Sequence, residues 1–222
     1  MNYSKVKQLE DITLSGRVVV SDPCYDRSVW CRGELAITPG VYETKLYYSD
    51  EGQWGNRVAK LGVYRKGAGE TVEEKKTEFS VGVDSGQAGI FCDTVYPGGE
   101  TGEYGEKDSF YGKVCDLTLG EGYEDRQERA ERKHSLKEIN KVPLPEWIRP
   151  ENVEHIRKYC EERLAQPEVP YWQGGTYEGK GIVSSSGYGD GGYDCVVGTD
   201  KDGLTTYVEI EFIGDGEEEE EV

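Results

Sequence analysis

A strict alternation of side-chain types near the end of the chain most constrains what it can fold into. In LTTYVEIEFI, residues 204–213, the set from Leu204 to Phe212 at every second position is apolar or β-branched, whereas Glu209 and Glu211 occupy positions in between. A period of two places the two sets on opposite faces of a β-strand. The segment therefore predicts a strand with one buried and one solvated face.

Further segments predict strands by the same alternation or by short apolar runs bounded by turn residues. They are GRVVVS (16–21), GVYETKLYYSD (40–50), RVAKLGVYRK (57–66), TEFSVGVD (77–84), AGIFCD (88–93), YEGKGIVSSS (177–186) and YDCVVGTD (193–200). The 30 glycines and 16 tyrosines suit many turns and half-exposed pleated surfaces. We therefore expect a mainly β fold, a β-sandwich or partly open barrel of antiparallel strands, with an α-helical insertion, and so α+β overall.

Helices are expected only in the middle of the chain. The segment 107–119 spaces Phe110, Val114 and Leu117 along one helical face, with Asp108 as the expected N-cap. The highly charged stretch 121–141 predicts a solvated helix or a mobile excursion, and a second helix is expected from Pro150 to about residue 166. The predicted organisation is a single β-rich domain over 1–214, a helical insertion over about 107–168, and an acidic disordered tail over 215–222.

The charge balance narrows the class of partner. With 44 acids against 26 bases the formal net charge is −18. Phosphate backbones are repelled by such a surface, so we expect no direct nucleic-acid binding. No stretch approaches about 20 apolar residues and the start lacks the apolar core of a signal peptide, so we expect no membrane association. Six cysteines without CxxC pairs predict reduced thiols and a cytoplasmic protein.

The glycine-rich stretch GYGDGG, residues 187–192, resembles a phosphate-binding loop in composition. Such loops need a helix N-terminus after the glycines, but here the strand YDCVVG follows. We therefore expect a tight hairpin turn in which Gly191 and Gly192 allow left-handed backbone. A strand–loop–strand nest that holds an anion remains an alternative.

A second turn, DSGQAG (84–89), also joins two predicted strands and carries Asp84 and Ser85. A nucleophilic serine needs a nearby base, and the only histidines, His134 and His155, lie in the charged insertion, so a Ser–His hydrolase is disfavoured. Aspartates at turns usually cap backbone amides, and we expect no metal and no cofactor.

The aspartates that could still gather as a carboxylate cluster are Asp22, Asp84, Asp93, Asp190 and Asp194. The thiols of Cys24 and Cys92 are each close to an aspartate in the sequence, which predicts raised thiol pKa values and argues against reactive-cysteine chemistry.

The strings VGVDSGQAGIFCD, FYGKVCDLTL and GIVSSSGYGDGGYDCVVG, with GRVVVSDPCYD upstream, resemble a family of bacterial and phage proteins called domain-of-unknown-function family 4241. The resemblance covers about three quarters of the chain and implies one β-rich domain, but no activity. It singles out the motif positions Asp22, Pro23, Asp84, Ser85, Gly86, Gln87, Gly89, Ser185, Ser186, Gly187, Gly189, Asp190, Gly191 and Tyr193.

Three of these motifs are turns at strand ends, and our hypothesis is that they converge on one face of the sheet. The ligand-binding candidates are Asp22, Asp84, Ser85, Gly86, Gln87, Ser185, Ser186, Gly187, Asp190 and Tyr193. The first functional hypothesis is a non-enzymatic module that binds a small polar ligand or a protein partner, in a phage accessory or counter-defence setting. The alternatives are an aspartate-centred, metal-assisted hydrolase and an acidic decoy that imitates nucleic acid.

Overall fold

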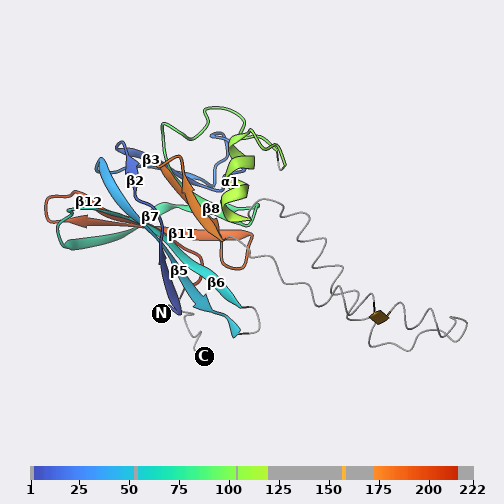
Figure 1. Cartoon of the computed structure of the whole chain (residues 1–222). Helices are drawn as coiled ribbons and strands as arrows, with labels where there is room; N and C mark the ends of the chain where they lie inside the picture. Colours follow the sequence, from blue (N-terminus) through green and yellow to red (C-terminus); the bar gives the residue numbers. More distant parts are fainter. Residues whose placement is uncertain (1–2, 53–54, 104, 120–156, 159–172, 215–222) are drawn as a thin grey trace, which may run out of the picture. The chain divides into compact units, whose positions relative to one another are not determined.

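The computed structural model describes residues 3–52, 55–103, 105–119, 157–158 and 173–214 (Figure 1). The chain divides into two compact units, one formed by residues 1–119 with 172–222 and the other by residues 120–171. All strands and the helix named below belong to the first unit. The predicted helices over 121–141 and 150–166 and the predicted tail over 215–222 lie outside the described residues, apart from residues 157–158.

Two antiparallel β-sheets make up the first unit. The seven-stranded sheet has the order β1-β5-β6-β12-β11-β7, and β2 also pairs with β5. Its strands are β1 (Lys5–Gln8), β2 (Ile12–Leu14), β5 (Gly40–Asp50), β6 (Asn56–Arg65), β7 (Thr71–Val83), β11 (Gly191–Asp200) and β12 (Thr205–Glu211). The five-stranded sheet has the order β4-β3-β8-β10-β9, with β3 (Arg17–Ser21), β4 (Gly33–Ala36), β8 (Gln87–Cys92), β9 (Gly174–Tyr177) and β10 (Gly181–Ser185).

The main hydrophobic core is built from strands of both sheets. Val18 and Ile90 of the five-stranded sheet and Leu46, Leu61 and Ile210 of the seven-stranded sheet all belong to this one cluster and are almost fully buried. Apolar side chains from two facing sheets that share one core define a β-sandwich. The predicted mainly β, α+β fold is therefore confirmed, and the sheets do not close into a barrel.

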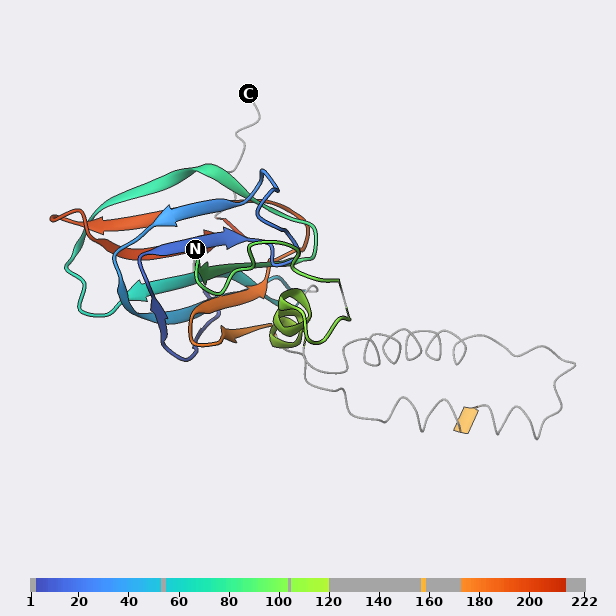
Figure 2. The same cartoon turned by 90° about the horizontal axis from the view of Figure 1, so that it is seen from above.

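A second, aromatic-rich cluster lies between the five-stranded sheet and the helix α1 (Phe110–Thr118). Val19 of β3, Phe91 of β8 and Val183 of β10 belong to it, together with Phe110 and Val114 of α1. In Figure 2 the helix lies beside the orange strands β9 and β10, and it contacts both of them. Because β3 and β8 are covered on both faces, their sequences contain continuous apolar runs instead of alternating ones.

Helix α1 confirms the predicted spacing but begins differently from the prediction. Phe110 and Val114 are buried, and Leu117 packs against the same cluster. The N-cap is Ser109 and not Asp108: the Ser109 hydroxyl accepts a hydrogen bond from the Gly112 backbone N–H at 3.0 Å. A serine at this position satisfies one of the N–H groups left without a partner at a helix start.

The strands that sequence patterning missed are the exposed or very short ones. β7 begins at Thr71, six residues before the predicted strand, and residues 71–76 are exposed on both faces, so they carry no alternation. The single strand predicted over 177–186 starts instead at the end of β9, and a turn over residues 178–180 separates β9 from β10. The short strands β1, β2 and β4 were not predicted.

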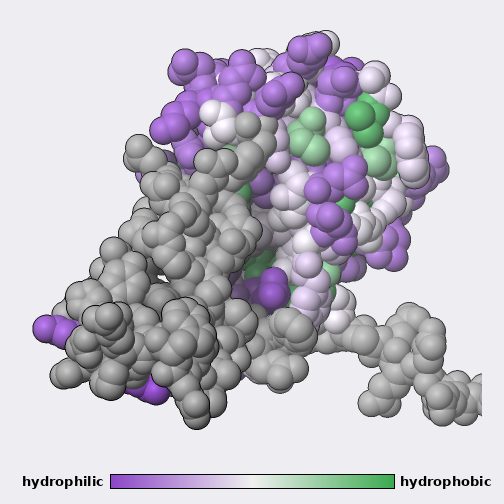
Figure 3. All heavy atoms as spheres, turned by 90° about the vertical axis from the view of Figure 1, so that its right-hand side faces the viewer, coloured by the Kyte–Doolittle hydropathy of each residue, from purple (hydrophilic) through white to green (hydrophobic). Residues whose placement is uncertain are grey.

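On the face of the molecule shown in Figure 3, hydrophilic and intermediate residues predominate and hydrophobic ones are scattered. Among the described residues, no helix has the length and apolar character needed to cross a membrane.

Replacing Phe91 by alanine tests the aromatic cluster under α1. Phe91 is fully buried, and its ring centroid lies 5.2 Å from that of Phe110 and 5.6 Å from that of Tyr96. We expect the Phe91→Ala change to lower the free energy of unfolding by about 3–5 kcal/mol, because a large cavity remains. Urea denaturation measures this. The exposed control Val72→Ala should change the value by no more than about 0.5 kcal/mol, and equal effects of the two variants would contradict the layering.

Candidate functional site

The carboxylate of Asp22 joins the end of β3 to the turn between β7 and β8. Its Oδ2 accepts hydrogen bonds from the backbone N–H groups of Asp84 (2.9 Å) and Ser85 (2.7 Å). Its Oδ1 accepts from the Ser85 hydroxyl (2.7 Å) and the Cys24 backbone N–H (2.8 Å). Asp22 is fully buried. Four donors occupy the principal acceptor positions of the carboxylate, so this residue acts as a clamp between two turns.

The third predicted turn lies next to the same junction. Ser185 pairs with Gln87 in the β8–β10 ladder, and the Ser186 backbone N–H donates to the Gly86 carbonyl at 3.0 Å. The end of β3, the start of β8 and the end of β10 lie at the same end of the five-stranded sheet, because neighbouring strands run antiparallel. The three turns therefore lie together at one end of this sheet and not at opposite ends, as the hypothesis of convergence requires. That they bind a ligand stays a prediction.

The side chains of the third turn hold the turn itself together. The Ser186 hydroxyl donates to the Gly189 carbonyl at 2.8 Å, and the Tyr193 hydroxyl donates to the carbonyls of Gly189 (2.6 Å) and Ser186 (3.0 Å). Gly187, at φ +59°, has left-handed backbone that strongly favours glycine. Asp190 is exposed. Most of these side chains therefore have structural partners of their own.

The expectation of a hairpin at GYGDGG is wrong. β10 pairs with β8 and β9, whereas β11 pairs with β7 and β12, so the turn carries the chain from one sheet to the other. Positive φ occurs at Gly187 (+59°), Gly189 (+113°) and Gly191 (+158°), whereas Gly192, which was also expected to allow left-handed backbone, is not among the glycines with positive φ. A local glycine pattern looks the same in a hairpin and in a crossover between sheets, because only strand pairing distinguishes them.

Gln87 connects the junction to helix α1 through a buried polar contact. Its side-chain carbonyl accepts from the Thr118 hydroxyl at 2.6 Å, and its amide donates to the Cys115 thiol at 3.5 Å. All three residues are buried. Burial raises the pKa of Tyr111, which also lies near the Ser85 hydroxyl and the Cys115 thiol. The candidate Gln87 therefore docks the helix onto the sheet.

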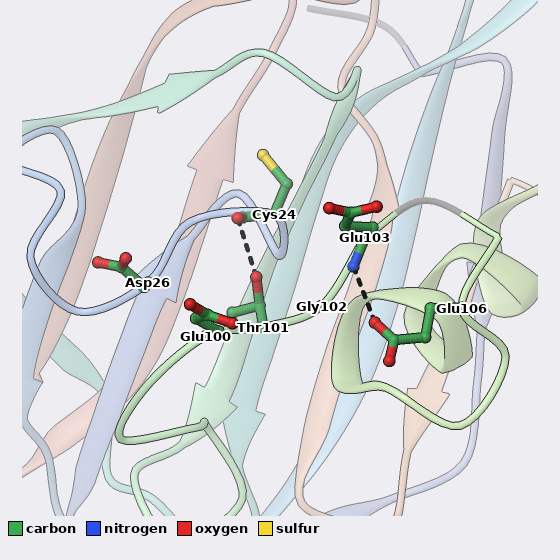
Figure 4. A pocket seen from close by; sticks show the side chains of 7 residues that line it. All are labelled: Cys24, Asp26, Glu100, Thr101, Gly102, Glu103 and Glu106. Atoms are coloured by element: carbon green, nitrogen blue, oxygen red, sulfur yellow. Dashed lines mark hydrogen bonds between the residues drawn. The ribbon is translucent and has the colours of Figure 1, made fainter.

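A cavity of about 730 Å³ borders the chain immediately after Asp22 (Figure 4). Its lining residues come from the loop after β3 and from the loop that precedes α1, and they are Cys24, Asp26, Glu100, Thr101, Gly102, Glu103 and Glu106. The Thr101 hydroxyl donates to the Cys24 carbonyl at 2.9 Å, and the Glu103 backbone N–H donates to the Glu106 carboxylate at 3.1 Å. The first of these bonds fastens the two loops together, and the walls that they form carry four carboxylates.

None of the ligand-binding candidates from the sequence is among the residues that line this cavity. One candidate, Asp22, acts on the cavity indirectly. Its carboxylate fixes the backbone of Cys24, and Cys24 lines the cavity. Residues 97–105 carry none of the motifs that indicated a site in the sequence. The available signal was the spacing of Glu100, Glu103 and Glu106, three residues apart, just before a helix.

The two thiols expected to have raised pKa values behave differently. Burial and the nearby Asp22 and Asp84 raise the pKa of Cys24. For Cys92 the expectation is wrong. Burial acts to raise its pKa, but hydrogen bonds from Ser15 and Thr94 outweigh this effect and bring the pKa to about 7. The neighbouring Asp93 carboxylate is instead paired with Arg27 at 2.7 Å.

Aspartates predicted as a possible cluster do not gather into a metal centre. In the part of the chain that the structure describes, no group of three or more His, Cys, Asp or Glu side chains could hold a metal ion. Asp194 pairs with Lys76 at 2.7 Å, on a different pair of strands from the junction.

Substituting asparagine for Asp22 tests the clamp. The amide group of asparagine has one oxygen, so its NH₂ group would face backbone N–H donors in a fully buried position. We expect Asp22→Asn to lower the free energy of unfolding by about 2–4 kcal/mol. Chemical denaturation provides the measurement. The exposed Asp190→Asn change is the control and should have little effect; a similarly mild effect at Asp22 would show that the clamp is dispensable.

Comparison with known proteins places the chain in a family. Neither the curated proteins nor the solved structures yielded a match to this chain. A family model matches residues 13–210, a range that includes every element from β3 to β11 and the whole Asp22 junction. The chain thus belongs to the family described as "Protein of unknown function (DUF4241)".

Proposed function

We propose that this protein is a non-enzymatic binding module that takes a small, positively charged polar ligand in the cavity beside Cys24. The cavity of about 730 Å³ is the observation that carries the proposal. Its volume is within the range of about 300–1,000 Å³ that is usual for small-molecule sites. The clamp at Asp22 and the bond between Thr101 and Cys24 hold its walls in place before a ligand arrives.

The charge of the lining supports a cationic ligand. Asp26, Glu100, Glu103 and Glu106 line the cavity, and no lysine, arginine or histidine is among its lining residues. Walls of one charge sign focus the field and concentrate ligands of the opposite sign. Asp26 and Glu106 stand at opposite ends of the lining in Figure 4. Such spacing suits an organic cation with several donor groups, since a calcium or magnesium ion needs oxygens within about 2.6 Å.

The state of the candidate nucleophiles favours binding over an aspartate-centred hydrolase. Asp22 accepts four hydrogen bonds, and the Ser85 hydroxyl is one of its donors. The Ser186 hydroxyl is engaged by the Gly189 carbonyl. A general base must be within reach of a substrate proton, whereas the Asp22 carboxylate is buried and already occupied.

The proposed setting is the cytoplasm of a bacterial cell or of a phage-infected host, where an accessory or counter-defence protein would act. The support is chemical: the cysteines in the described part of the chain (Cys24, Cys31, Cys92, Cys115 and Cys195) carry free thiols. Free thiols persist in reducing compartments.

A panel of organic cations tests the proposed ligand class. Agmatine and spermidine should raise the midpoint of thermal unfolding of the purified protein, with glycerol as the uncharged comparison. A ligand at 100 times its Kd stabilises by about 2.7 kcal/mol. Native mass spectrometry of the same protein should show a retained cation or the added probe bound in a 1:1 ratio.

The double change Glu100→Gln/Glu103→Gln removes two carboxylates from the lining and should abolish the stabilisation. The matched control is Glu73→Gln/Glu78→Gln, which removes the same charge from exposed positions of β7. The proposal fails if no probe stabilises the wild type, or if the control loses as much stabilisation as the cavity variant.

A further inference from the structure

The loop between β3 and β4 presents an almost fully exposed tryptophan. Trp30 is 89% exposed, the largest exposed fraction among the exposed large hydrophobic side chains of the described residues. A single exposed apolar residue is common on protein surfaces. An exposed tryptophan is more informative than other apolar residues, because tryptophan is enriched among the few interface residues that contribute most of the binding free energy. What surrounds Trp30 therefore decides whether its exposure has a consequence.

The loop that carries Trp30 is held rigidly by Arg27. The Arg27 guanidinium donates to the carbonyls of Pro97 (2.9 Å), Asp93 (3.1 Å) and Tyr96 (3.1 Å). It also pairs with the carboxylate of Asp93 at 2.7 Å. These contacts connect the loop to the segment that leads into the cavity wall. A preformed loop loses little conformational entropy when a partner binds.

Arg32 closes the other end of the loop. Its guanidinium donates to the Arg27 carbonyl at 3.0 Å and pairs with Glu34 at 2.8 Å. Both arginines near Trp30 in the sequence are thereby occupied by partners within the protein. Neither of them is among the residues that line the cavity.

Trp30 and one wall of the cavity belong to one stretch of chain. Asp26 lines the cavity, and its carboxylate accepts from the Ser28 backbone N–H at 2.7 Å. The Val29 backbone N–H donates to the Asp26 carbonyl at 3.3 Å, so residues 26–29 form a closed turn. Trp30 follows directly after this turn. The exposed ring is therefore carried by the same loop as one wall of the cavity, four positions after Asp26.

We propose that the occupant is an arginine-bearing segment of a partner protein, which inserts a guanidinium into the acidic cavity and covers Trp30 with a neighbouring part of its chain. This inference rests on the proposed function and names its ligand. Guanidinium groups pair with carboxylates in a planar, two-bonded geometry and also stack on tryptophan faces. Both kinds of surface occur here on one loop, because Asp26 lines the cavity and the exposed Trp30 follows four positions later. The net charge of −18 attracts basic partners over a distance.

Isothermal titration with the peptide Gly-Arg-Gly-Arg-Gly-Arg-Gly tests the inference on the full chain. The comparison peptide has citrulline in place of each arginine, which keeps the shape and removes the charge. We expect binding of the arginine peptide only. Trp30→Ala should weaken that binding at least 10-fold without loss of folding, because the side chain is exposed. Glu100→Gln/Glu103→Gln should weaken it at least as much.

The controls separate this inference from the proposed function. Val72→Ala and Glu73→Gln/Glu78→Gln should bind the peptide like the wild type, and Trp30→Ala should still bind agmatine. Peptide binding that is unchanged in Trp30→Ala, or absent in a wild type that binds agmatine, overturns the inference and leaves the small-ligand proposal standing. Failure of both agmatine and the peptide overturns both.

Discussion

The arrangement of the site depends on one buried carboxylate. Asp22 holds the end of β3 against the turn in which the chain passes from the seven-stranded sheet to the five-stranded sheet, between β7 and β8. An unpaired charge at this depth would be costly, and the donors that surround it remove that cost. The same carboxylate fixes the Cys24 backbone, and through it the start of the loop that forms one wall of the cavity.

The other wall is positioned by the aromatic layer. Tyr96 packs against Phe91 and Phe110, and its hydroxyl donates to the Tyr25 carbonyl at 2.5 Å. The segment between β8 and α1 is thereby tied to the loop after β3 before it continues to Glu100. Gln87 and Ser109 fix the helix that follows. A polar cavity at the surface is thus supported by a core that is apolar on both sides of the five-stranded sheet, as expected for sites placed on rigid elements.

Part of the negative charge of the protein is concentrated in the cavity. A net charge of −18 by itself speaks for solubility and for basic partners in general. Four of the acids line one cavity, and an exposed tryptophan follows the first of them in the chain. A general electrostatic preference thereby becomes a proposal about one ligand class, in which carboxylates select charge and the indole selects a flat cation.

Local sequence patterns were sufficient to predict the strands in which burial determines which positions are apolar. The strand within residues 204–213 and the apolar runs of β3 and β8 are each visible within a few residues, because one or both of their faces are buried. The predicted solvated position of Glu209 is wrong, since this side chain is buried and pairs with Lys60. Residues 71–76 of β7 were missed because both of their faces are exposed, and Ser109 was missed as the N-cap because Asp108 beside it has the same capping chemistry. The motif residues of three turns were also found, since glycine, serine and aspartate mark turns by composition.

Only the tertiary structure decided what those turns do. Asp22 and Ser85 are 63 positions apart, and Cys24 and Thr101 are 77 positions apart, so no local period relates them. Their contacts arise from the order of strands in the two sheets, which brings loops that are distant in the sequence to the same end of the five-stranded sheet. Most of the motif side chains form hydrogen bonds within the protein. The cavity beside them is lined mainly by the loop before α1, which carries none of these motifs. Side-chain periodicity is a property of neighbouring residues, whereas a binding site is a property of which loops the sheet pairing places together.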